Sequence, residues 1–167
     1  MAVFELGTLK TNELQKTENS GFYKIFEKRV DAKALAILQA LKPSVTKAAL
    51  QDSLLRGGYP DAVIDYQPDK FRLWMENYFK LYINRDVRQL FPRLDLVKYR
   101  RFVAMLASLS GQIVNKAELA RSLDVSETTA KDYLDIAHGT FVWRNTFVYE
   151  RDTTKSLVKM PRGGFRD

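Results

Sequence analysis

Apolar side chains recur every three or four residues along most of this chain, the spacing that places them on one face of an α-helix. Residues 31–42 show this pattern behind Asp31, a residue type that caps helix N-termini, and Pro43 follows as a helix terminator. The next helix is predicted to have Ser44 as its cap and to end at Gly57-Gly58. Both helices lie in a predicted helical region over residues 1–66.

The longest predicted helix runs from about Pro68 to Phe91, and Pro92 ends it. Large apolar residues repeat along it at helical spacing: Phe71, Trp74, Met75, Tyr78, Tyr82 and Leu90. An aromatic stripe can stack on nucleic-acid bases, but a buried seam against another helix is the commoner use of this spacing. We therefore predict that the stripe forms core.

Three shorter helices are predicted after it, the first over residues 96–109. Asn115 caps the second, with Glu118 three residues later as in a capping box; Ser126 caps the third, and Gly139 ends it. Their predicted inner faces are Tyr99, Phe102, Val103, Leu106 and Leu109, then Leu119, Ala120 and Leu123, then Ala130, Tyr133, Leu134 and Ala137. The last two helices, joined by a short turn, have the pattern of a helix-turn-helix.

Runs of β-branched and aromatic residues at 141–143 and 146–149 predict one or two strands after these helices. Helices followed by strands are the outline of a winged helix. The predicted fold is therefore mainly α: a helical bundle over residues 1–66, then a winged helix-turn-helix with a short C-terminal β-hairpin over residues 67–167.

Composition narrows the functional classes. The chain has no cysteine, which excludes disulfides, thiolate metal sites and cysteine nucleophiles. It has no run of eighteen apolar residues and no leader pattern, so we expect a cytoplasmic protein without a membrane partner. Its net charge of +7 and pI near 9.6 favour a polyanionic partner.

The basic residues are concentrated before and after the helix-turn-helix, and few lie on its predicted recognition helix. The predicted recognition helix has one outward cation, Lys131, beside the carboxylates Glu127, Asp132 and Asp135, so base-specific reading by this helix is disfavoured. The candidate nucleic-acid-binding residues are Arg100, Arg101, Thr128, Lys131, Arg144, Arg151 and Lys155. The alternative is that these basic groups are solvated or pair with nearby acids.

No set of catalytic residues is complete in the sequence. The single histidine, His138, precedes a helix-ending glycine, where it is expected to face solvent near the negative end of the helix dipole. No segment has the phosphate-binding pattern of glycine, four residues and Gly-Lys-Ser or Gly-Lys-Thr. Acidic residues are not spaced as metal ligands. We therefore predict no catalytic residue, no metal and no cofactor for this chain.

Four stretches together, in this order, resemble a large family of bacterial and archaeal AAA-type ATP-binding proteins. They are "LLRGGYPD", "WMENYFKLYINRDVRQLF", "LASLSGQIVNKAELARSLDVSETTAKDYLDIAHGTFV" and "TTKSLVKMPRGGFRD". The resemblance covers roughly Val3 to Asp167. In that family a phosphate-loop ATPase core precedes a helical lid, a winged helix and a domain similar to restriction endonucleases.

The resemblance implies that this chain corresponds to the lid and winged helix, with the ATPase core absent and ATP a cofactor of the full-length parent only. Leu9 and Glu13 match the segment that leaves the core, and Gly58 and Pro60 match a lid corner that lines the adenine pocket when a core is present. A simple helix-ending turn is the alternative for that corner.

Two other matches carry expectations. Arg85 and Asp86 recur in the family without a secure role, and we predict a buried ion pair between them. The tail from Lys159 to Asp167 departs from the family's lysine-serine-proline-lysine pattern, and we predict a frayed end there.

Three functions remain open from the sequence. The first is a lid and winged-helix segment that couples nucleotide state to DNA or a protein partner, without ATPase activity of its own. The second is a free-standing winged-helix transcriptional regulator that binds DNA as a dimer. The third is a protein-interaction module, for which the acidic outer side of the predicted recognition helix is the best argument.

Overall fold

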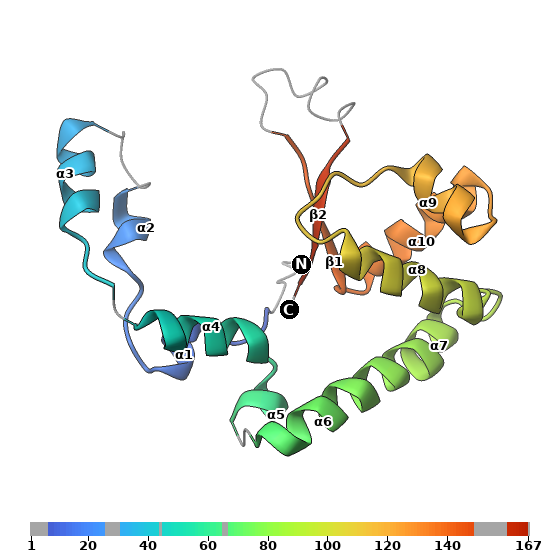
Figure 1. Ribbon diagram of the computed structural model, residues 1–167, viewed down its shortest axis with the longest axis horizontal. Coiled ribbons are helices and arrows are strands. Elements are labelled where there is room, and N and C mark those ends of the chain that lie inside the picture. Colours follow the sequence, from blue (N-terminus) through green and yellow to red (C-terminus); the bar gives the residue numbers. More distant parts are fainter. Residues whose placement is uncertain (1–6, 26–30, 44, 65–66, 149–159, 167) are drawn as a thin grey trace, which may run out of the picture. The chain divides into compact units, whose positions relative to one another are not determined.

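A computed structural model describes residues 7–25, 31–43, 45–64, 67–148 and 160–166. Ser44, Arg151 and Lys155 lie outside these ranges. The chain is mainly helical with a two-stranded antiparallel sheet (Figure 1). It divides into two compact units, Met1–Trp74 and Met75–Asp167, with the boundary inside a helix. Each unit is described by itself.

The first unit consists of short helices. In chain order they are α1 (Thr11–Leu14), α2 (Gly21–Ile25), α3 (Ala32–Ala40), α4 (Lys47–Arg56), α5 (Pro60–Val63) and the start of α6 (Pro68–Leu81). Asp31 caps α3 as predicted, because its side chain accepts a hydrogen bond from Ala34 N at 2.9 Å.

The predicted cap of α4 is wrong. Thr46 is the N-cap: its backbone is extended and its Oγ1 accepts a hydrogen bond from Ala49 N at 3.2 Å. The sequence has two hydroxyl residues two positions apart, and both types cap helices well. Helix-capping propensity therefore does not distinguish Ser44 from Thr46 as the N-cap of α4.

Few apolar side chains of the first unit are buried among the described residues. The buried ones are Ile25, Ala34 and Ala62. Exposed large apolar side chains on α3 and α4 are Leu35, Ile37, Leu50, Leu54 and Leu55. The helical periodicity of this region is therefore correct, but its apolar faces are not covered within the described part of the unit.

The second unit continues from α6 through a π-helix, η1 (Tyr82–Val87), into α7 (Arg88–Leu90). Three helices follow: α8 (Leu96–Ser108), α9 (Lys116–Leu123) and α10 (Glu127–Gly139). They confirm the helices predicted from periodicity. Asn115 and Ser126 cap α9 and α10 as predicted, accepting bonds from Ala117 N and Thr129 N.

The aromatic stripe is core only in part. Tyr82 is buried at 5% exposure, but Phe71, Trp74 and Met75 are only half-buried. Tyr78 and Leu90 are exposed at 36% and 63%, so the prediction of a buried stripe is confirmed at Tyr82 and wrong at these two positions. A π-helix closes i→i+5 hydrogen bonds and therefore changes which residues follow each other on one face. The buried residues beyond Tyr82 are Ile83 and Val87.

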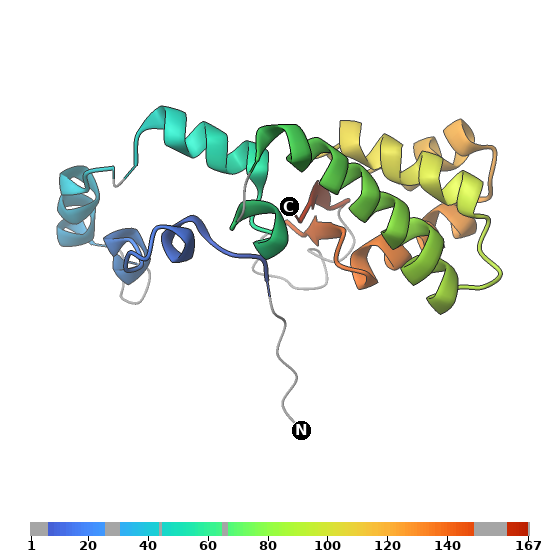
Figure 2. The same cartoon turned by 90° about the horizontal axis from the view of Figure 1, so that it is seen from below.

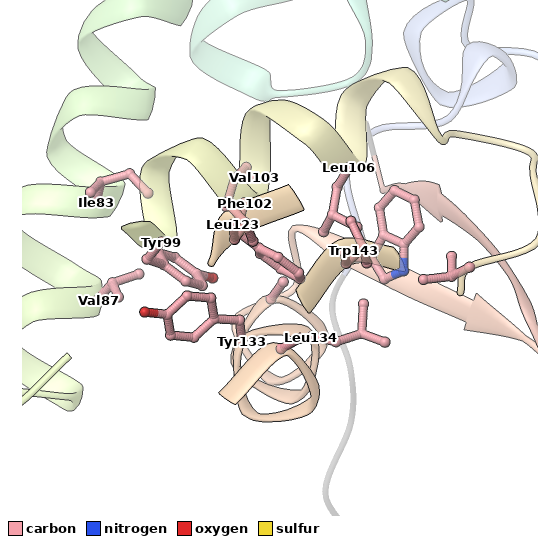
Figure 3. Packing of buried hydrophobic residues seen from close by; sticks show 14 of the residues in the cluster. Ile83, Val87, Tyr99, Phe102, Val103, Leu106, Leu123, Tyr133, Leu134 and Trp143 are labelled. Atoms are coloured by element: carbon pink, nitrogen blue, oxygen red, sulfur yellow. The ribbon is translucent and has the colours of Figure 1, made fainter. Parts of the chain in front are cut away.

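Aromatic rings of α8 and α10 form the centre of the core (Figure 3). The Tyr133 ring lies edge-on to the Tyr99 and Phe102 rings, with centroids 5.5 Å apart in both pairs. The predicted inner residues of α8, α9 and α10 are all buried except Leu109, which is half-buried. Their burial confirms the periodicity argument for these three helices.

Buried hydroxyl groups join η1 to α8 and α10. Thr140 Oγ1 donates its one hydrogen to Ile136 O at 2.7 Å. It is therefore the acceptor in its 2.6 Å hydrogen bond with Tyr82 Oη. Tyr82 Oη in turn accepts from Tyr99 Oη at 2.9 Å. Burial is the largest cause that raises the pKa of both tyrosines. The network satisfies polar groups that would otherwise be costly to bury.

Residues Arg162–Phe165 of the C-terminal tail form a strand, so the predicted frayed end is wrong there, whereas Lys159 and Asp167 lie outside the described residues. Strand β2 (Arg162–Phe165) pairs antiparallel with β1 (Trp143–Thr146), and both strands are seen from below in Figure 2. The register places Trp143 opposite Phe165. On the other side of β2, Gly163 N donates to Gln112 O and Gly111 N donates to Gly163 O. A β-carbon at position 163 would overlap the indole ring of Trp143, which is fully buried.

We predict that Gly163→Ala lowers the free energy of unfolding by about 1–3 kcal/mol, because the added methyl group displaces the Trp143 ring in a close-packed core. Gly139→Ala is the matched control, since nothing lies within 4 Å of a β-carbon there. Urea titration followed by tryptophan fluorescence measures both. Equal stability of the two variants would contradict the packing described here.

We further predict that the free energy of unfolding falls as the pH rises above about 10. Tyrosines of the unfolded chain ionise near 10.0, whereas the raised pKa of Tyr82 and Tyr99 keeps these groups neutral in the folded chain. The contribution of these two tyrosines to the free energy of unfolding is therefore complete below pH 10 and is lost as the pH rises above 10. Urea titrations across this pH range should give a shallower decline for Tyr99→Phe than for the unaltered chain.

Candidate functional site

The candidate nucleic-acid-binding residues lie on three elements and are exposed where they are described. Arg100 and Arg101 are on α8, Thr128 and Lys131 on α10, and Arg144 on β1. Arg100 Nη2 donates to Asn84 Oδ1 of η1 at 2.9 Å, so this side chain also ties two helices together. These residues do not converge on one pocket.

The outward side of α10 is acidic. Glu127, Asp132 and Asp135 are exposed on the same helix as the exposed Lys131. Carboxylates repel phosphate, and sequence reading in the major groove depends chiefly on Arg, Lys, Asn and Gln side chains. The geometry therefore gives α10 poor chemistry for a recognition helix.

The outer face of the hairpin is basic instead. In the observed register Arg144 faces Gly164 and Thr146 faces Arg162, so Arg144 and Arg162 share one face of the sheet. The opposite face carries the buried Trp143 and Gly163. Arg162 Nη1 donates to Gly111 O at 3.1 Å, which holds its guanidinium beside the sheet. Arg162 lies 18 positions after Arg144 in the sequence, and the strand register places both on this face.

A groove of about 830 Å³ lies between the turn after α7 and the side of α10. One wall is the segment Leu90–Asp95, and the other is formed by Thr129, Asp132, Tyr133, Asp135 and Ile136. Two short hydrogen bonds fix the turn: Phe91 N donates to Val87 O and Leu94 N donates to Phe91 O. None of the candidate nucleic-acid-binding residues that the structure describes lines this groove. The sequence does not predict this groove, because its two walls come from segments some forty positions apart.

Tyr133 connects the groove to the core, since it lines the groove and is 3% exposed. Burial raises the pKa of its hydroxyl, and the nearby Asp95 raises it further. Asp95 also caps α8, with its Oδ1 accepting from Val97 N and Lys98 N at 3.0 Å each. The groove thus has an apolar, rigid floor with carboxylates around it.

The corner at Gly58 is packed against the N-terminal segment. Leu9 N donates to Gly58 O at 2.8 Å, and a β-carbon on Gly58 would overlap the backbone of Leu9. Pro60 is exposed and begins α5. A pocket of about 250 Å³ beside this corner is lined by Gly57, Ser53 and Thr11 among others, and neither Gly58 nor Pro60 lines it. The close approach to Leu9 accounts for a glycine at position 58.

The expected buried pair of Arg85 and Asp86 is on the surface. Arg85 Nε donates to Asp86 Oδ1 at 2.7 Å, and their side chains are 65% and 47% exposed. These adjacent residues are on the outer side of η1, whereas Ile83 and Val87 point into the core. A surface pair of this kind contributes little stability.

His138 is exposed near the end of α10, as predicted, and its Nδ1 lies 3.2 Å from Trp143 O. Within the described residues no group of three acidic or histidine side chains is placed to hold a metal ion. Over the same ranges, no helix has the length and apolar composition needed to cross a membrane.

Comparison with known proteins gives a family without an assigned activity. Residues 47–167 match the model described as "Domain of unknown function (DUF8612)". Two relatives are the uncharacterized proteins Rv2008c of Mycobacterium tuberculosis and Mb2031c of Mycobacterium bovis, each 35% identical over 113 residues. The match covers 68% of this chain and 26% of either relative, so the chain spans about a quarter of their length. No solved structure matches. Because the family model covers most of the chain, this protein belongs to the DUF8612 family.

Proposed function

We propose that this chain is a binding and coupling segment of a larger AAA-type ATP-binding protein, with a winged helix as its second unit and without ATPase activity of its own. The observation that carries the proposal is the order of the elements in that unit. Three helices, α8, α9 and α10, are followed by the β1–β2 hairpin. This order matches the lid-and-winged-helix resemblance of the sequence.

A short extended segment between α8 and α9 supports the winged-helix assignment. Ile113 forms an antiparallel bridge with Arg162, and Val114 N donates to Pro161 O at 3.2 Å. Strand β2 therefore lies between this segment and β1. Winged helices have a small sheet of this kind, with one edge strand inserted between the first two helices and the hairpin as the wing.

The exposed leucines of α3 and α4 support a coupling role for the first unit. Leu54 and Leu55 are 75% and 79% exposed, and Leu35 is 54% exposed. Leu54 and Leu55 are adjacent on α4, and exposed large apolar side chains that lie together are typical of a surface that contacts another protein part. An ATPase core is the occupant that the resemblance implies, and the relatives are long enough to contain one.

The charge distribution favours phosphate contact through the hairpin over base reading by α10. Arg144 and Arg162 share the outer face of the sheet, whereas α10 presents three carboxylates. We therefore propose that the winged helix binds duplex DNA through its wing, with little sequence preference. This mode differs from the insertion of a recognition helix into the major groove.

A fluorescence-anisotropy titration with a labelled duplex at about 50 and about 200 mM salt tests DNA binding. We expect binding that weakens steeply with salt. Arg144→Gln should reduce the slope of log affinity against log salt by about one, since one phosphate contact is lost. Lys131→Gln on α10 is the matched control and should leave the slope unchanged.

Two results would count against this reading. Loss of slope in Lys131→Gln with no change in Arg144→Gln would assign DNA contact to α10. Absence of binding at the lower salt concentration would remove DNA as a ligand and favour a protein-interaction module. Light scattering separates the free-standing regulator, which binds two half-sites as a dimer, from a segment that acts as a monomer.

A further inference from the structure

We propose that the groove between Leu90–Asp95 and α10 is a docking site for a cationic amphipathic helix of another protein. This inference concerns a different surface from the basic hairpin and goes beyond DNA binding. It rests on the size of the groove, on its apolar lining and on the charges around it.

The groove has the size and the surface of a binding site. Its volume of about 830 Å³ is within the range of about 300–1,000 Å³ that is usual for ligand sites. Leu90 is 63% exposed and Phe91 is 37% exposed, although both are large apolar side chains. Exposed apolar groups beside a hollow mark an interaction surface.

The shape of the groove is set by its surroundings and does not depend on a ligand. The Tyr133 ring on its floor is held by edge contacts with Tyr99 and Phe102. The turn on the opposite wall is held by its backbone bonds to Val87 and Phe91, and Asp95 is held as the cap of α8. A preformed apolar groove receives the apolar face of a helix at a low ordering cost to the protein.

The charges select the kind of helix. The described residues that line the groove include three carboxylates, Asp95, Asp132 and Asp135, and one cation, Arg93. No ion pair engages Asp132 or Asp135 within the described part of the chain, and both are exposed. A helix with leucine-type residues on one face and lysine or arginine on its flanks would place its cations beside these carboxylates. Nucleic acid would be repelled by the same groups.

Titration of the whole chain with a synthetic, fluorescein-labelled peptide of about 15 residues tests the site. The peptide has leucine at three- and four-residue spacing and lysine on both flanks. Its matched analogue has every lysine replaced by glutamine. We expect the lysine peptide to bind more tightly, with an advantage that shrinks as salt is raised.

Variants of the groove locate the binding. Asp132→Asn with Asp135→Asn should weaken the lysine peptide about two- to thirty-fold, the effect of losing two exposed ion pairs. Glu127→Gln on the same helix is the control, because Glu127 is exposed and does not line the groove. Leu90→Asn should weaken both peptides about tenfold, and the control is Val97→Asn, at an exposed residue outside the groove.

Amide chemical-shift mapping of the unaltered chain needs no variant, and it should place the perturbations at Leu90–Asp95 and along one side of α10. Equal affinity for the two peptides would overturn the proposal, as would shifts confined to other elements. Concentration-dependent self-association that Leu90→Asn abolishes would also overturn it, because the occupant would then be a second copy of this chain.

Discussion

The contact between the Trp143 indole and the backbone of Gly163 holds the second unit together. Trp143 is the first residue of β1 and follows α10 closely, whereas Gly163 belongs to the tail of the chain. Because position 163 lacks a side chain, β2 comes close enough for the ring to be covered completely. The ring also lies edge-on to Phe165, with centroids 5.5 Å apart. This packing contact thus stabilises the glycine-containing tail as a strand.

The hairpin that results determines where charge is displayed. Burial of Trp143 and Gly163 on one face leaves Arg144 and Arg162 on the other face. On the helical side, the core of Tyr99, Phe102 and Tyr133 orients α10 so that its carboxylates are outward. The unit therefore has a basic surface on its sheet and an acidic one on its third helix. Separate surfaces of opposite charge suit two different partners, a polyanion and a cationic protein segment.

The two units differ in how far they bury their own apolar residues. The second unit contains a continuous core, part of which is shown in Figure 3. This core includes residues from η1, α8, α9, α10 and β1. In the described part of the first unit, leucines of α3 and α4 remain exposed. In the proposed coupling role, the first unit would bury these leucines against a further protein part and would therefore respond to changes in that part.

The sequence by itself determined the helices and their inner faces in the second unit, because a period of three to four residues directly reports which side of a helix is apolar. It also determined the caps at Asp31, Asn115 and Ser126, which depend on local hydrogen bonds. Only the tertiary structure decided the burial limit at Leu90, the strand formed by the tail, the placement of Arg144 and Arg162 on one face of the sheet, and the groove beside α10. Each of these depends on a π-helix or on contacts between segments far apart in sequence, and neither leaves a period or a local signal in the chain.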